Sequence, residues 1–175
     1  MKILKNLGFL LITLIAFKAN AQTDKATTIR IVEAKKFLFV ATSALPLNSN
    51  EINSVIRQMP GSTGGNINLS GSNYDLKITA DSLVAYLPYY GRSYSAPVNR
   101  DDNGFKFTAK DFTYTSKKNK RGWDVSMEPK DVRDNVRMNL SISESGYASL
   151  SVMSNSKQSI TYNGYISEIP VKKIK

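Results

Sequence analysis

The chain has 175 residues, and its 24 Lys and Arg outnumber its 14 Asp and Glu, so the formal net charge is +10 at pH 7. It contains no His and no Cys. These absences exclude disulfides, histidine metal ligands, histidine pH sensing and the Ser-His and Cys-His pairs of nucleophilic enzymes.

The first 21 residues have the pattern of a secretory signal peptide. Lys2 and Lys5 precede an apolar run, Leu7–Phe17, which is too short to span a bilayer. Ala19-Asn20-Ala21 is a small-x-small cleavage site. We therefore expect a signal peptide over residues 1–21 and a single domain over residues 22–175 with a formal charge of +7, located in the periplasm or secreted. An uncleaved N-terminal membrane anchor is the alternative.

The mature chain opens with a predicted helix that leads into a predicted strand. Apolar residues recur at helix spacing over Thr23–Lys36, and Asp24 is a suitable N-cap. Phe37–Thr42 is a bulky, partly β-branched run, and Pro46 ends it. This composition favours a strand, with continuation of the helix as the alternative.

The least regular region follows, over Asn48–Gly65. The apolar residues of Glu51–Met59 fit one face of a short helix. Pro60–Gly65 is rich in glycine but lacks the Gly-Lys-Ser/Thr ending of a phosphate-binding loop. We interpret it as a flexible loop.

From Tyr74 onwards, apolar and polar residues alternate in segments that short turns separate. Such segments predict about eight or nine strands, each with one buried and one wet face, in an all-β antiparallel meander. Accumulated twist and unpaired edges would close this meander into a barrel, with the N-terminal helix plugging or flanking one end. The predicted turns are Ala80–Ser82, Asn103-Gly104, Lys117–Gly122, Asp134-Asn135, Ser145-Gly146 and Asn155-Ser156.

Several segments together resemble the domain of unknown function 4251 family, a family of secreted proteins mostly from Bacteroidota. They are Phe37–Ala41 after a helix, Leu87–Tyr94, Gly122-Trp123, Gly146–Ala148 and Ile160–Gly164. The resemblance covers nearly the whole mature chain and implies a lipocalin-like barrel, without an assigned activity. It also leads us to expect an arginine after the penultimate strand, where this chain has Lys157.

The segment Leu87–Pro97 has the highest local density of aromatic residues and carries the candidate ligand-binding residues Tyr89, Tyr90, Arg92 and Tyr94. Tyrosine combines an apolar ring with a polar tip, and arginine can stack on rings or bind a carboxylate or phosphate. These side chains would line a barrel mouth. In the alternative interpretation, the rings cover the barrel end and Arg92 is bound to backbone carbonyls.

Other residue patterns favour structural roles. Trp123 is expected in the core. Ser154 and Lys157 match Ser-x-x-Lys, but a predicted turn separates them, so we expect no catalysis there. Asp101–Gly104 lacks the spacing of a calcium loop. The basic groups at Lys117–Arg121 and Lys172–Lys175 could meet anionic headgroups, although a solubilising hairpin tip and tail is the simpler interpretation.

Two functions fit these observations. The first is non-enzymatic binding of a small amphipathic, apolar or lipid-like ligand inside the barrel. The second is an envelope module with a filled barrel that has a structural role or binds a protein partner, because topology alone does not show whether a barrel of this size is full. We expect no enzymatic activity, cofactor, metal, nucleic-acid partner or transmembrane span.

Overall fold

The computed structural model describes residues 23–47, 60–62, 65–95 and 104–170 of the chain. One helix and ten strands lie in these residues. The elements are α2 (Lys25–Glu33), β1 (Phe37–Pro46), β2 (Ile67–Asn68), β3 (Asp75–Ile78), β4 (Leu83–Pro88), β5 (Gly104–Ala109), β6 (Phe112–Asn119), β7 (Gly122–Pro129), β8 (Val136–Ser143), β9 (Tyr147–Ser154) and β10 (Ile160–Ser167).

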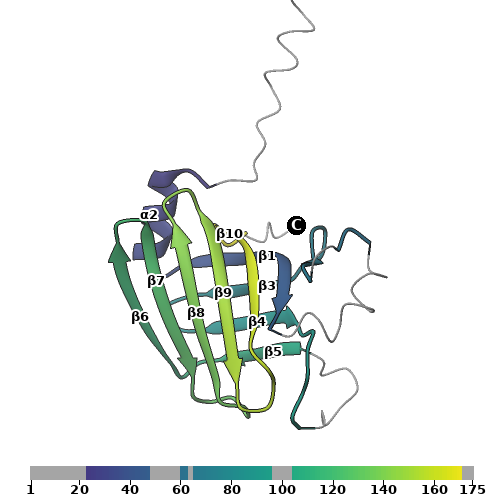
Figure 1. Cartoon of the computed structure of the whole chain (residues 1–175). Coiled ribbons are helices and arrows are strands. Elements are labelled where there is room, and N and C mark those ends of the chain that lie inside the picture. Colours follow the sequence, from purple (N-terminus) through teal and green to yellow (C-terminus); the bar gives the residue numbers. More distant parts are fainter. Residues whose placement is uncertain (1–22, 48–59, 63–64, 96–103, 171–175) are drawn as a thin grey trace, which may run out of the picture.

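The strands form one antiparallel sheet in the order β5-β4-β3-β1-β10-β9-β8-β7-β6, with β2 paired to β1. Strands β6 to β10 make one wall, and β1, β3, β4 and β5 cross behind it (Figure 1). The walls are joined where β1 pairs with β10, from Leu38 opposite Ser167 to Pro46 opposite Ile160. This arrangement confirms the predicted antiparallel barrel, which is nearly closed: among the described strands, β5 and β6 lie at the two ends of the order.

Close approach of β1 and β10 depends on a residue without a side chain. A Cβ atom at Gly164 would lie 1.9 Å from the carbonyl oxygen of Val40, on the neighbouring strand β1. That distance is far below any tolerated contact. Gly164 therefore permits the ladder that connects the first and last strands of the barrel.

The alternation in the sequence sorts side chains between the interior and the solvent. In β8, for example, Val136, Met138, Leu140 and Ile142 are buried, and the residues between them are exposed. Phe39, Leu87, Leu150 and Tyr162 come from four different strands, and each has 0% of its surface exposed. A side chain lining a cavity wide enough for water would retain accessible surface. The interior at these positions is therefore packed with side chains.

Helix α2 lies across one end of the barrel (Figure 1). The predicted cap is confirmed, because the carboxylate of Asp24 accepts a hydrogen bond of 3.0 Å from the Thr27 amide. Ile31 and Val32 are buried against the core. The helix is shorter than predicted, since the chain turns at Ala34 and Lys35 has φ of +49°. Among the described residues, no helix is both long enough and apolar enough to cross a membrane.

Strand β1 is longer than the predicted run, and Pro46 is its last residue. Its ladder with β10 shifts register between Ala41 and Ser43. On its other side, the first half of β1 pairs with β3 and the second half pairs with β2. Strand β2 was not predicted, because two residues are too few to show alternation. The helix predicted over Glu51–Met59 lies outside the described residues.

Candidate functional site

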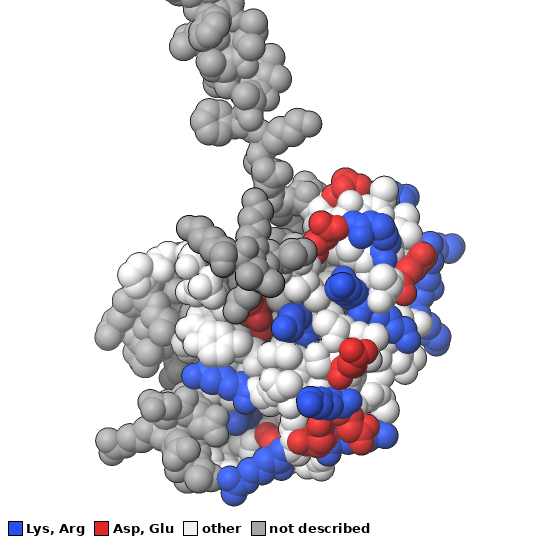
Figure 2. All heavy atoms as spheres, turned by 180° about the vertical axis from the view of Figure 1, so that it is seen from behind, with Lys and Arg blue, Asp and Glu red and all other residues white. Residues whose placement is uncertain are grey.

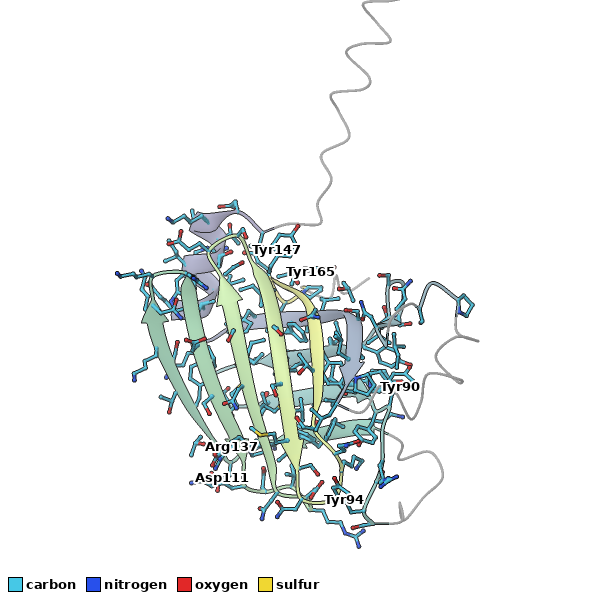
Figure 3. All side chains as sticks on the ribbon, in the orientation of Figure 1. Tyr90, Tyr94, Asp111, Arg137, Tyr147 and Tyr165 are labelled. Atoms are coloured by element: carbon cyan, nitrogen blue, oxygen red, sulfur yellow. The ribbon has the colours of Figure 1, made fainter. Side chains whose placement is uncertain are left out.

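The segment Tyr89–Tyr94, here called the strap, leaves the end of β4 and crosses to the turn between β9 and β10. Two backbone hydrogen bonds hold it there: the Tyr94 amide donates to the Ser156 carbonyl at 2.8 Å, and the Gln158 amide donates to the Arg92 carbonyl at 3.0 Å. Figure 3 shows Tyr90 beside the rear strands and Tyr94 near the β9–β10 turn. The strap thus connects strand β4 of the rear wall to the β9–β10 turn of the front wall.

Tyrosine side chains close the space beneath the strap. The hydroxyl of Tyr89 donates to the Arg92 carbonyl at 2.8 Å, and its ring packs edge-on against Phe105 with 5.8 Å between centroids. The buried hydroxyl of Tyr162 donates to the carbonyl of Pro88 at 2.5 Å. Both hydroxyls therefore satisfy backbone carbonyls, and both rings fill the corner between the walls.

This environment favours the neutral form of the tyrosines. Burial raises the pKa of Tyr162 well above its ordinary value, and proximity to Tyr89 and Tyr90 raises it further. Burial is also the main cause that raises the pKa of Tyr89 and of Tyr90. The raised pKa values extend the pH range in which these hydroxyls stay protonated to above the ordinary pKa of 10.0.

The outer side of the same region presents a second aromatic group. Tyr74 stacks on Tyr86 with 5.6 Å between centroids, and the ammonium of Lys106 lies 5.3 Å from the Tyr86 ring. Tyr94, on the strap, is 64% exposed. The predicted site residues are thus divided: Tyr89 and Tyr90 are half-buried in the corner, while Arg92 and Tyr94 are exposed.

The sequence did not indicate that Tyr74, Phe105 and Tyr162 would join this region. They lie on or beside three different strands, and only the pairing of those strands with their neighbours brings them to the strap. Lys157 lies here as well, with its ammonium 5.5 Å from the Phe105 ring. An ammonium over a ring needs charge rather than the planar fork of arginine, so lysine suits this position.

Burial and hydrogen bonds test the roles predicted for Trp123 and for the Ser154–Lys157 pattern. Trp123 is 3% exposed, which confirms its place in the core. Ser154 donates its hydroxyl to Asp134 at 2.5 Å, and Ser156 does the same, so Ser154 is not directed at Lys157. Asp101, Asp102 and Asn103 lie outside the described residues. In the part of the chain that the structure describes, no group of three acidic side chains is arranged to hold a metal ion.

A shallow surface cavity of about 570 Å³ lies on the outer face of β7, β8 and β9. Arg137 and Glu128 form an ion pair of 2.5 Å in its lining, beside Met153 and Ser154. Figure 3 shows Arg137 at the lower end of the front wall. The side chains of the pair are 61% and 42% exposed, so water weakens their mutual attraction, and we assign the pair no catalytic role.

Comparisons with known proteins agree with the fold. The model of the family described as "Domain of unknown function (DUF4251)" matches residues 19–166. A crystal structure of a DUF4251 family protein from Bacteroides eggerthii DSM 20697 is 11% identical in sequence. Its TM-score is 0.56, over 82% of this chain and 87% of that chain. At this identity the likeness concerns the fold alone. No curated protein matches the chain.

Proposed function

The chain belongs to the DUF4251 family, and we propose that it is an exported, non-enzymatic interaction module of the cell envelope with a filled barrel. One observation carries this proposal. The core side chains of the described strands, from Phe37 and Phe39 on β1 to Ile166 on β10, are 0–6% exposed. Phe107, Phe112 and Tyr114, on the end strands β5 and β6, pack against this core and are half-buried. The core side chains are buried, so a partner could contact only the outer surface of the barrel.

The same observation supports one of the two functions that the sequence left open. A carrier of a small ligand needs a cavity of at least a few hundred Å³, lined largely by apolar side chains. The large side chains of Phe39, Leu87 and Tyr162 are instead fully buried and belong to one continuous hydrophobic core. Tyr89, on the strap, packs in the corner between the two walls. These contacts favour the filled module over the ligand carrier.

The proposals of export and of a non-enzymatic role come from the sequence. Residues 1–21 have the three parts of a signal peptide. The chain lacks His and Cys, the side chains that most often act as base or nucleophile near neutral pH. These features support export and a non-enzymatic role.

Native mass spectrometry of the protein, purified gently from a bacterial periplasm, tests the proposal. We expect the mass of residues 22–175 alone, before and after incubation with an envelope lipid extract. The same sample sprayed under denaturing conditions is the control. A reproducible additional mass that disappears on denaturation would show a carried ligand and overturn the filled module. A mass that retains residues 1–21 would contradict cleavage of the signal peptide.

A further inference from the structure

Six basic side chains gather at the end of the barrel that α2 covers. Lys35 and Lys36 follow the helix, and Lys117, Lys118, Lys120 and Arg121 form the tip of the β6–β7 hairpin; all six are exposed. We call this group the basic end. Figure 2 shows blue side chains, with fewer red ones, along the margin formed by α2 and this hairpin.

Aromatic rings hold two of these side chains in place. The ammonium of Lys35 lies 5.1 Å from the ring centroid of Tyr114 on β6, which fastens the end of α2 beside the hairpin. The ammonium of Lys118 lies 5.5 Å from the ring of Trp123 on β7. Each ring covers one side of an ammonium group and leaves the other side to the solvent. The helix and hairpin charges therefore belong to one surface.

Nearby acidic groups do not neutralise this surface. Glu144 pairs with Lys25 at 2.8 Å, and Glu168 pairs with Arg30, so these two carboxylates are engaged by cations outside the basic end. Asp124 accepts hydrogen bonds from Asn119 at 2.7 Å and from Ser141 at 2.9 Å. Even if Asp124 and Glu33 are both counted against the six cations, the basic end keeps a clear positive excess.

The path of the chain adds a second observation. The described chain begins at Thr23, whose hydroxyl donates to the carbonyl of Ile166 at 2.5 Å. The turn before β9 lies between this place and the hairpin tip: the Ile166 amide donates to the Gly146 carbonyl at 2.8 Å, and the Glu144 amide donates to the Arg121 carbonyl at 3.3 Å. The chain thus enters the barrel at the basic end.

We propose that the basic end docks on an anionic membrane surface. The charges stand on a hairpin tip and a helix end at the margin of the molecule, where long lysine side chains can reach a flat array of headgroup phosphates together. The surface cavity, by contrast, lies at the other end of β7, near Lys130, so the basic end is not built around it. This inference relies on the proposed export, which brings the protein to a membrane, and not on whether the barrel is filled.

Vesicle co-sedimentation of residues 22–175 tests this inference. The probes are vesicles of phosphatidylcholine containing phosphatidylglycerol, and vesicles of phosphatidylcholine alone. We expect binding to the anionic vesicles only, and its loss in high salt because exposed charges are screened. Replacing Lys117→Glu and Lys120→Glu together should weaken binding by more than about tenfold, because each basic residue adds to the attraction.

A matched variant separates this surface from net charge. Lys110→Glu with Lys130→Glu makes the same change in charge near the other end of β7, on exposed residues, and should leave binding within about twofold. Lys117→Gln with Lys120→Gln should weaken vesicle binding less than the charge-reversed pair does. This neutral pair keeps the test valid if the charge-reversed protein fails to fold. All three variants should keep the melting temperature of the parent.

Three outcomes would overturn the inference: no binding of the parent to anionic vesicles, equal weakening by the two charge-reversed pairs, or tighter binding to polyglutamate than to vesicles. The last outcome would assign the basic end to an acidic protein partner. Vesicle binding is independent of the intact mass, so failure here leaves the filled module standing. A ligand found by mass spectrometry would likewise leave the docking surface untouched.

Discussion

The strap and the basic end use aromatic side chains in opposite ways. At the strap, the rings of Tyr89 and Tyr162 pack in the corner between the walls, and their hydroxyls donate to carbonyls of the same chain. At the basic end, the rings of Tyr114 and Trp123 support ammonium groups that point to the solvent. At the strap, the tyrosine hydroxyls are bound to other groups of the fold, whereas at the basic end the ammonium groups are exposed to the solvent. Substitutions should therefore change stability at the strap and binding at the basic end.

The largest effect is expected from Tyr162→Ala. This change removes a fully buried ring and leaves the carbonyl of Pro88 without its partner, so the free energy of unfolding should fall by about 3–5 kcal/mol. Urea unfolding of the purified domain measures it. Lys120→Ala, at the basic end, is the control and should stay within about 0.5 kcal/mol of the parent. An equal decrease in the free energy of unfolding for the two variants would contradict the expectation that the strap, and not the basic end, stabilises the fold.

Alkaline pH should distinguish the same regions. Burial raises the pKa of Tyr162, Tyr89 and Tyr90, so the folded protein keeps protons that unfolded tyrosines lose above their ordinary pKa of 10.0. Their contribution to stability is complete below pH 10 and declines as pH rises further.

For the buried Tyr162, the free energy of unfolding should fall by at most about 1.4 kcal/mol per pH unit, and solvent makes the contribution of the half-buried Tyr89 and Tyr90 smaller. Urea unfolding in steps above pH 10 measures it for the parent and for Tyr162→Phe. The variant should show the smaller slope, whatever its stability at neutral pH. Parallel curves for the two proteins would contradict the assignment of Tyr162 to this decline.

The smallest effect is expected from Tyr89→Phe, which removes only the hydrogen bond to the Arg92 carbonyl. Stability should fall by about 1 kcal/mol, and the Gln158 amide, which shares that carbonyl, should exchange its hydrogen faster. Thermal unfolding and hydrogen exchange measure the two changes. Tyr94→Phe, on an exposed ring of the same strap, is the matched control. Binding to anionic vesicles should be unaffected by either change; a loss in Tyr89→Phe would couple the two regions.

Much of the fold follows from local patterns along the chain. Alternation of apolar and polar residues located the strands from Asp75 to Ser167, because a strand turns successive side chains to opposite faces. Asp24 marked the start of the helix, and the predicted tip at Lys117–Gly122 is the β6–β7 hairpin. The position of Trp123 in the core followed from its place on such a strand.

The candidate site was less predictable, because its residues come from distant parts of the chain. The aromatic density of Leu87–Pro97 indicated the strap, but not that Tyr89 and Tyr162 would use their hydroxyls on backbone carbonyls. The charges at Lys117–Arg121 indicated a basic tip, but not that Lys35 would join it through Tyr114. A binding role for Tyr89, Tyr90, Arg92 and Tyr94 stays a prediction.

The sequence by itself determined which residues form strands, which face of each strand is apolar, and which chemistries the chain lacks. Those properties depend on neighbouring residues and on composition. Only the tertiary structure decided how the barrel closes: β1 and β10, at opposite ends of the domain, share a long ladder, whereas β5 and β6, two residues apart, lie at the two ends of the strand order. It also decided which side chains from distant strands are buried together, such as Phe39, Leu87 and Tyr162. Both outcomes depend on how whole walls curve and pack against each other, and no local pattern of residues records that geometry.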